Sequence, residues 1–458
     1  MRAFGSFLLA AFTFIIPAVA SAHAFGQQFT LPLPFSLYAN GAAVALIASF
    51  VFLGLYSNPV PADAPYIVRR IPFSTRALVF LGASIGISAF IGMLALILFG
   101  SPDFFQNPAP ILFWIILMLG VTYASVLIGG IWRLLNPFEH IVRLFFSRRQ
   151  SLMQFPLKFR YVPALILYFV LVWLELLSFG GGAMPWAIGV ILLSYLFISF
   201  IGALVFGVDD WFEYGDMFNT FFGVIGYFAP VQIDRDGIEI MPPGERLVEK
   251  SVATMPLLIF ILFVLSSTAF DGLSETQIWW SVMYHSALQM NFFTLERTIV
   301  LALSPFIFFA LYAGAIYFMK VFARSSLHYR ELALRFGYSL VPIAIAYSFA
   351  HYFMVLVNET QTLIGNISDP FAMGWNLFGT VGYAPDIALI GAKTVWYIQL
   401  STIVIGHIIA TYIAHRIALR VFHSRTQIIL GQLPILILMV FYTVFGLWIL
   451  SQGYQDGV

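Results

Sequence analysis

The sequence contains no cysteine, and only 9% of its residues are Asp, Glu, Lys or Arg. Without cysteine the chain forms no disulfide, no thiolate nucleophile and no Cys-ligated metal site, so any metal would have to be held by His, Asp or Glu. A soluble domain has about 25% charged residues, whereas 61% of this chain is hydrophobic. The composition therefore predicts an all-α, polytopic membrane protein with a single membrane domain and no separate soluble domain.

Excess charge of either sign is also missing, because the formal net charge is only +1. Bulk electrostatics therefore gives no indication of a nucleic-acid partner. The partners that remain are the lipid bilayer and a small-molecule ligand, and the sequence leaves the oligomeric state open.

The first residues have the pattern of a signal peptide. Met1-Arg2 is a basic start, residues 7–19 are an apolar run, and Ala20-Ser21-Ala22 is a small-residue cleavage site. Removal of residues 1–22 would leave His23 as the mature N-terminus. An uncleaved first helix is the alternative, although the apolar run is short for a membrane span.

Ten later segments are long and apolar enough to cross a bilayer. When the mature N-terminus is placed outside, every Lys and Arg of the mature chain except Arg297 and Lys393 falls on the inner side, as expected for cytoplasmic loops. The sequence thus predicts one membrane domain of residues 23–458, with both mature termini in the periplasm. Its longer loops are predicted on the cytoplasmic side at 207–251 and on the periplasmic side at 271–297 and 358–395. The predicted spans are 35–56, 77–99, 110–132, 161–179, 186–206, 252–270, 298–319, 337–357, 396–415 and 428–450.

Two segments share a Gly-Tyr and Ala-Pro pattern, residues 219–230 and 376–385. Counting the first as an eleventh span would put the later Arg-rich loops outside, so we predict a re-entrant or interfacial segment there. The second segment falls in a periplasmic loop. Similar elements on opposite sides of a membrane are typical of the inverted repeats of transporters, although a match this short also arises by chance.

One predicted span carries an imidazole, which hydrocarbon solvates badly. Tyr347, Ser348, His351, Val355 and Asn358 recur at offsets of three and four, so they are expected on one helix face that points into the bundle. A functional role for His351 and a simple hydrogen bond to a neighbouring helix are both compatible with this pattern.

Three histidines expected on the outer side form a candidate metal set, namely His23, His285 and His351. An N-terminal His23 offers an imidazole and an α-amine, and further imidazoles would complete a nitrogen-ligand site suited to a divalent transition metal, copper or zinc. Asp369 or Asp386 would add a carboxylate from the same side. The three histidines lack the close spacing of a metal-binding motif, so a protein without a metal is the alternative.

Glu175 is the only carboxylate within a predicted span, and His407 lies near the middle of another. A carboxylate in the membrane is a candidate proton carrier or general base, with His407 or His351 as its partner. These three residues are the candidate catalytic set. A hydrated Glu175 at the membrane boundary is the competing interpretation.

Gly82 and Gly86 belong to a Gly-x-Ser-x-Gly pattern, which in serine hydrolases needs a strand, a turn and a helix. A membrane helix does not supply this context. The two glycines, four residues apart, are instead predicted to allow close helix packing.

Several stretches resemble a family of bacterial polytopic membrane proteins that is largely uncharacterised. They are His23-Ala-Phe-Gly-Gln-Gln, Asn107-Pro-Ala-Pro, Trp132-Arg-Leu-Leu-Asn-Pro, Ala346-Tyr-Ser-Phe-Ala-His-Tyr-Phe and Asp369-Pro-Phe-Ala-Met-Gly-Trp-Asn. Some members of the family are labelled fenitrothion hydrolase, so the resemblance implies hydrolysis of an organophosphorus ester and supplies no catalytic residues.

Three functions remain open at this point. A hydrolase would need a polarised water, most simply on a metal at the outer histidines. A small-molecule or ion permease is favoured by ten spans, polar residues inside helices and the two Gly-Tyr and Ala-Pro segments. A membrane subunit or assembly factor of a larger complex needs no catalytic signature.

Overall fold

The computed structural model describes residues 21–452, apart from 25–26, 57–67, 73, 147–150, 179–181, 235–236 and 288–289. Ten helical segments in this part of the chain are long and apolar enough to span a membrane, which confirms the predicted all-α, multi-pass architecture. They are α2 (Phe35–Tyr56), α3 (Arg76–Phe99), α4 with η1 and α5 (Ala109–Leu127), η2 with α8 (Leu157–Leu176), α9 (Pro185–Phe206), α13 (Met255–Ser274), most of α15 (Met290–Phe322), α16 with η3 and α17 (Tyr329–Asn366), α18 (Ala392–Val421) and α19 (Arg425–Ser451).

The predicted signal peptide comprises residues 1–22, of which residues 1–20 lie outside the described part of the chain. The shorter helices are α6 (Ile131–Leu135), α7 (Pro137–Phe145), α10 (Val208–Tyr214), α11 (Met217–Gly226), α12 (Glu245–Glu249) and α14 (Gln277–Ala287). Near the start, β1 (Ser21–Ala24) pairs antiparallel with β2 (Gln27–Thr30).

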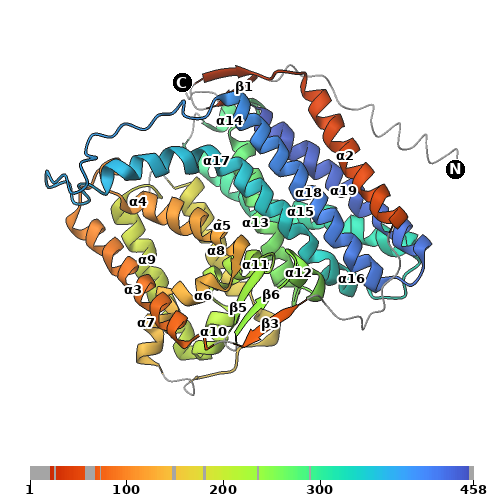
Figure 1. Cartoon of the computed structure of the whole chain (residues 1–458), viewed down its shortest axis with the longest axis horizontal. Helices are drawn as coiled ribbons and strands as arrows, with labels where there is room; N and C mark the ends of the chain where they lie inside the picture. The colour runs from red at the N-terminus through yellow and green to blue at the C-terminus, as the bar shows by residue number, and fades with distance from the viewer. Residues whose placement is uncertain are drawn as a thin grey trace.

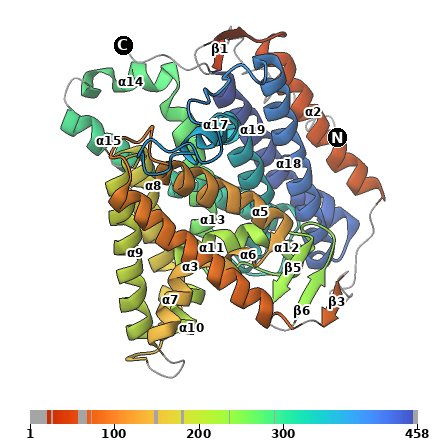
Figure 2. The ribbon, with the colours of Figure 1, turned by 60° about the vertical axis from the view of Figure 1, so that its left-hand side comes forward.

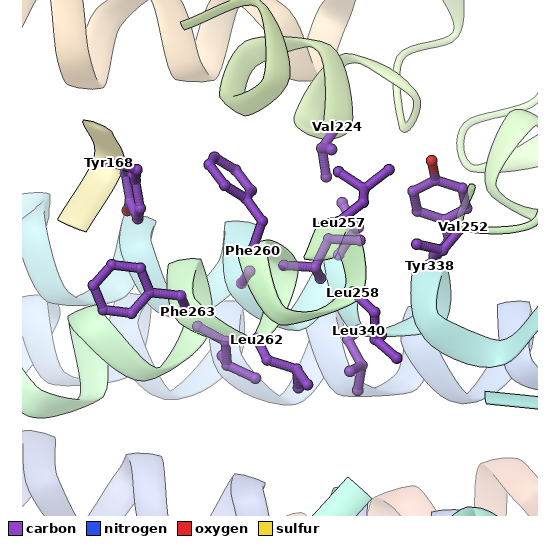
Figure 3. Close-up of a cluster of buried hydrophobic side chains, with 14 of the residues drawn as sticks. Tyr168, Val224, Val252, Leu257, Leu258, Phe260, Leu262, Phe263, Tyr338 and Leu340 are labelled. Atoms are coloured by element: carbon purple, nitrogen blue, oxygen red, sulfur yellow. The ribbon is translucent and has the colours of Figure 1, made fainter. Parts of the chain in front are cut away.

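Helix α13 lies at the centre of the bundle and contacts α8, α15, α17 and α19 (Figures 1 and 2). Most of its residues are apolar and buried, as expected for a helix surrounded by others. Figure 3 shows Phe260 and Phe263 of α13 among side chains of neighbouring elements, including Tyr168 of α8, Val224 of α11 and Tyr338 of η3 (Gly337–Leu340). Burial of these large side chains is the main stabilising contribution of the core.

Two groups of helices flank α13. On one flank α2, α18 and α19 pack against one another, and on the other α3, α7 and α9 do so (Figure 1). Between α17 and α18 the approach is close, because a Cβ on Gly406 would collide with Ala346. The small side chains at this crossing are typical of helix packing in membranes.

The third span is irregular, whereas the sequence predicted one helix over 110–132. Residues Leu112–Gly120 form a π-helix, α5 ends at Leu127, and the short strand β4 (Ile128–Gly129) follows. Gly130 has a φ of 82°, a left-handed conformation that favours glycine, and α6 begins directly after it. The chain therefore turns before it reaches the predicted end of the span.

A four-stranded sheet closes one end of the bundle, with strand order β3, β6, β5, β4. It consists of β3 (Arg69–Pro72), β6 (Gly237–Ile240), β5 (Val231–Asp234) and β4, and the β4–β5 pair is parallel. We call this the sheet end. Figure 2 shows it at the opposite end of the molecule from β1 and α14.

The two segments with a Gly-Tyr and Ala-Pro pattern adopt different structures. The first contains α11, whose ten residues are too few to span a bilayer, and which packs against α5, α6 and α8. The second, residues 376–385, is a loop without helix or strand, and most of its residues are exposed. The non-spanning nature predicted for the first segment agrees with the structure, but the pair is not a structural repeat.

Gly82 and Gly86 lie where α3 crosses α6. A Cβ on either glycine would collide with the backbone carbonyl of Leu134 or Leu135. The predicted packing role of these glycines is therefore confirmed.

Candidate functional site

A cavity of about 170 Å³ lies between η1, α5, α8, α11, α13 and α17. Apolar side chains form much of its wall, but seven polar side chains also line it. We call it the acidic cavity, and its polar lining consists of Thr122, Tyr168, Glu175, Ser267, Thr268, Ser348 and Tyr352. The π-helix and the short α11 contribute to the wall, and such departures from regular α-helix are frequent at functional sites.

Glu175 supplies the only carboxylate among the residues that line this cavity. Nine positions separate it from Ile166, which puts the two about 180° apart at about 100° per residue. Ile166 is 56% exposed on the outer surface of the bundle, so Glu175 faces inward. Because Glu175 is also exposed and lies one residue from the end of α8, we infer that the cavity opens beside it.

A second acidic group lies just behind the cavity wall. The carboxylate of Asp271 accepts a hydrogen bond from the Tyr352 hydroxyl at 2.8 Å, and the same oxygen is 2.9 Å from Nε2 of His351. Tyr352 lines the cavity, whereas Asp271 and His351 do not. One tyrosine hydroxyl therefore connects the cavity wall to the Asp271–His351 pair.

Gly272 makes this pair possible. A Cβ at this position would lie 2.6 Å from Ile449, 3.3 Å from the His351 ring and 3.3 Å from the Tyr347 hydroxyl oxygen. Only a residue without a side chain allows α13 to approach α17 this closely. The adjacent Asp271 can then reach the imidazole.

The sequence prediction missed Asp271 because it ended the span at residue 270, whereas α13 continues to Ser274. The statement that Glu175 is the only carboxylate within a span is therefore wrong. Asp271 follows Ser267 by one helical turn. That spacing on a continuing helix is the signal that could have identified it.

Further charges lie near the C-terminal end of α13, close to Asp271. A helix of about 20 residues is about 30 Å long, so this end is far from the N-terminal end of the same helix. Arg297 attracts the carboxylates of both Asp271 and Glu275, and its side chain donates a hydrogen bond to the carbonyl of Leu176 at 3.3 Å. Burial raises the pKa of Glu275, and the nearby Asp271 carboxylate raises it further. One further acid, Glu275, and one arginine, Arg297, therefore lie near the Asp271–His351 pair.

The predicted polar face of α17 divides into two faces. Ser348 and Val355, together with Tyr352, line the acidic cavity. Tyr347 instead packs in the apolar cluster around Ile403 and Leu447. His351 is on this second side of the helix, one turn from Tyr347.

His407 is not part of this arrangement. It is 2% exposed on α18, and its Nδ1 lies 2.9 Å from the carbonyl of Ile403. Its Nε2 has no hydrogen-bond partner within the described residues. No described contact joins His407 to Glu175 or His351. Of the candidate catalytic set, Glu175 and His351 are linked through Tyr352 and Asp271, whereas His407 is not.

The candidate metal set is described only in part. His23 lies in β1 and His285 in α14, but their side chains are outside the described part of the structure, and His351 is bonded to Asp271. Among the side chains that are described, no group of three or more His, Asp or Glu residues could hold a metal ion. The copper or zinc site remains a prediction.

The two loop carboxylates proposed to help that metal stabilise their own loop. Asp369 accepts hydrogen bonds from the backbone N–H groups of Met373 and Gly374, and Asp386 accepts one from Ala388. Neither contacts His351 in the described structure.

Comparisons with known proteins provide no relative that would assign a role to this cavity. No protein-family model, no curated protein and no solved structure matches the chain. The site is therefore interpreted from its own geometry.

Proposed function

We propose that the chain is a permease that moves a small polar solute or ion across the membrane in exchange for, or together with, protons. The observation that carries this proposal is the acidic cavity, which combines one carboxylate with tyrosine, serine and threonine hydroxyls inside the ten-span bundle. Ionisable groups within spans are costly and commonly mark ion or substrate pathways.

The size of the cavity favours a small solute. Ligand pockets for drug-sized molecules measure about 300–1,000 Å³, whereas this cavity measures about 170 Å³. It has room for several water molecules or for one solute of a few heavy atoms. An aromatic organophosphorus ester is too large for it in this conformation.

The two acidic groups provide a route for protons. Glu175 lies at the opening, while Asp271 lies behind the wall and shares one oxygen between His351 and Tyr352. Tyr352 lines the cavity together with Glu175 and donates to Asp271, so one hydroxyl links the surroundings of the two carboxylates. A proton on either carboxylate changes the charge of this region, so the charge state of the cavity can follow proton binding.

Solid-supported-membrane electrophysiology on proteoliposomes tests the proposal, with amino acids, small carboxylic acids, simple sugars and inorganic ions as probes. We expect at least one probe to give a transient current that depends on pH and falls at least tenfold in Glu175→Gln. The matched control is Glu331→Gln, because Glu331 forms an exposed pair with Arg335. Absence of current from all probes in the native protein would contradict the proposal.

A hydrolase is the second candidate, and the Asp271–His351 pair is the observation in its favour. A histidine held by a carboxylate is the usual arrangement of a general base that activates water. Turnover of an organophosphorus triester in detergent, lost in His351→Gln and retained in His407→Gln, would support this function. A permease gives no such turnover.

We also propose a bacterial inner-membrane location with both mature termini in the periplasm, supported by the distribution of Lys and Arg. Because the chain lacks cysteine, single cysteines can be introduced without background. In intact spheroplasts, an impermeant maleimide should label Ala388→Cys, in an exposed loop, and not Ser326→Cys. The reverse pattern would overturn this orientation.

A further inference from the structure

We propose that a second cavity, at the sheet end, binds a phosphate group. This cavity measures about 100 Å³ and is lined by Trp132, Arg133, Asn219, Gln232, Arg246 and Lys250, among others. We call it the basic cavity. It is separate from the acidic cavity and independent of the proposed transport function, since α11 presents Phe221 and Ile225 to the acidic cavity and Asn219, Phe222 and Gly223 to the basic one.

The charges that line the basic cavity are all positive. Three cations and no carboxylate contribute to its wall. Arg246 is paired with Glu239, but Glu239 also pairs with Arg70 at 2.8 Å, so two arginines share one carboxylate. The local charge is therefore positive even at the paired position.

The other two cations have no acidic partner within the described residues. Lys250 lies 4.9 Å from the ring centroid of Tyr227, a cation–π contact that leaves its charge in place. Arg133 has no ion pair or hydrogen bond in the described structure. Both also line an adjoining cavity that contains Glu139, Asp209 and Glu213, but neither forms an ion pair with them in the described structure, so an anion in the basic cavity would gain two unpaired cations.

Two buried donors also lack acceptors. Trp132 is 3% exposed, and its indole Nε1 has no partner in the described part of the chain. The same holds for Nε of Arg246, whose side chain is 12% exposed. A buried N–H without an acceptor is destabilising. Both residues line the basic cavity, so an oxyanion bound there is a natural acceptor.

The chemistry of these donors selects phosphate. Guanidinium groups match the oxygens of a phosphate with parallel hydrogen bonds, and an ammonium group adds a point charge. The basic cavity has room for a single phosphate group, and it shares Arg133, Asn219 and Lys250 with an adjoining cavity of about 1080 Å³ that could hold the rest of a phosphate-bearing ligand. A free phosphate and the headgroup of an anionic phospholipid share this chemistry, and Trp132 also lines an apolar cavity of about 500 Å³.

Gly223 provides a way to block the basic cavity. It lines the cavity, and a Cβ placed on it would meet no atom within 4 Å. The Cβ of a larger residue at this helical position therefore enters open space, and a leucine would extend from it into the cavity. Helix propensity also favours leucine over glycine, so the variant is expected to fold.

The test measures binding to the purified full-length protein. The two probes are inorganic phosphate, followed by radiolabelled phosphate retention in detergent, and phosphatidylglycerol, followed by lipid retention in nanodiscs with phosphatidylcholine as the neutral reference. The variants are Gly223→Leu, the double variant Arg133→Gln/Lys250→Gln, and the charge-matched control Arg330→Gln/Lys393→Gln at exposed positions that do not line the cavity.

We expect the native protein and the control to bind at least one probe, and both cavity variants to lose at least tenfold in affinity. Binding of inorganic phosphate identifies a free phosphate as the ligand, and selective retention of phosphatidylglycerol identifies a lipid headgroup. The proposal is overturned when the native protein binds neither probe, or when Gly223→Leu binds as tightly as the native protein.

Discussion

The acidic and basic cavities lie on opposite faces of the ten-residue helix α11. They differ in whether the charged groups nearby are paired within the chain. Behind the wall of the acidic cavity, one carboxylate oxygen of Asp271 is bonded to both His351 and Tyr352. In the basic cavity Arg133 and Lys250 line the wall without an acidic partner among the described residues. The first arrangement completes its charge within the chain, and the second leaves a place for an anion.

This difference follows from depth in the bundle. Asp271 lies within an apolar span, where an unpaired charge is very costly, so a partner from another helix is required. Arg133 and Lys250 are exposed at the sheet end, where water compensates their charge until a ligand arrives. Variants that alter charge at the two depths should therefore differ strongly in stability.

The largest effect is expected for Asp271→Leu. It leaves His351 and Tyr352 without their shared acceptor, and because the two side chains of the pair are only about 17% exposed, the loss should approach the roughly 3–5 kcal/mol of a fully buried pair. The free energy of unfolding in mixed micelles measures this loss. Glu331→Leu, which breaks an exposed pair between side chains about 40% exposed, should cost under about 1 kcal/mol. Equal losses would contradict the importance assigned to depth.

A smaller effect is expected for Gly272→Ala. The added methyl collides with Ile449 and presses on His351, and such overpacking costs about 1–3 kcal/mol. Gly314→Ala is the matched control, since a Cβ on Gly314 in α15 meets nothing within 4 Å. The control should be neutral or stabilising by up to about 1 kcal/mol. A Gly272→Ala protein as stable as the control would show that close approach of α13 and α17 is not required.

A pH dependence is expected at Asp216, which precedes α11 outside the spans. Burial raises its pKa to about 7, even though Tyr195 and the Asn219 backbone N–H donate to it at 2.6 Å. The folded protein then holds a proton that the unfolded chain, with a pKa near 3.8, releases. This contribution to stability is present below about pH 4 and is lost as pH rises through about 7.

Asp216→Asn removes that titration and keeps an acceptor oxygen for the helix cap. The thermal midpoint in detergent should fall less between pH 5 and pH 8 in the variant than in the native protein. Parallel pH profiles would show that Asp216 does not titrate in this interval.

Much of the fold was predictable because hydrophobic length decides whether a helix spans a bilayer. The site was predictable only in part. The sequence identified Glu175 and His351, but not Asp271, because the predicted span ended four residues before α13 does. The contact between Asp271 and His351 also requires the close approach of the two helices at Gly272, which the sequence does not reveal. The basic cavity depends on the turn at Gly130 and on the pairing of β4 with β5, which periodicity does not reveal.

The account rests on the claim that Glu175 exchanges protons as solute passes through the acidic cavity. Sealed proteoliposomes with a pH-sensitive dye in the lumen test this claim, using the solute that gives the largest current. We predict that solute addition changes the luminal pH with the native protein and with Glu331→Gln, and leaves it unchanged with Glu175→Gln. A luminal pH change of full size in Glu175→Gln would contradict the account.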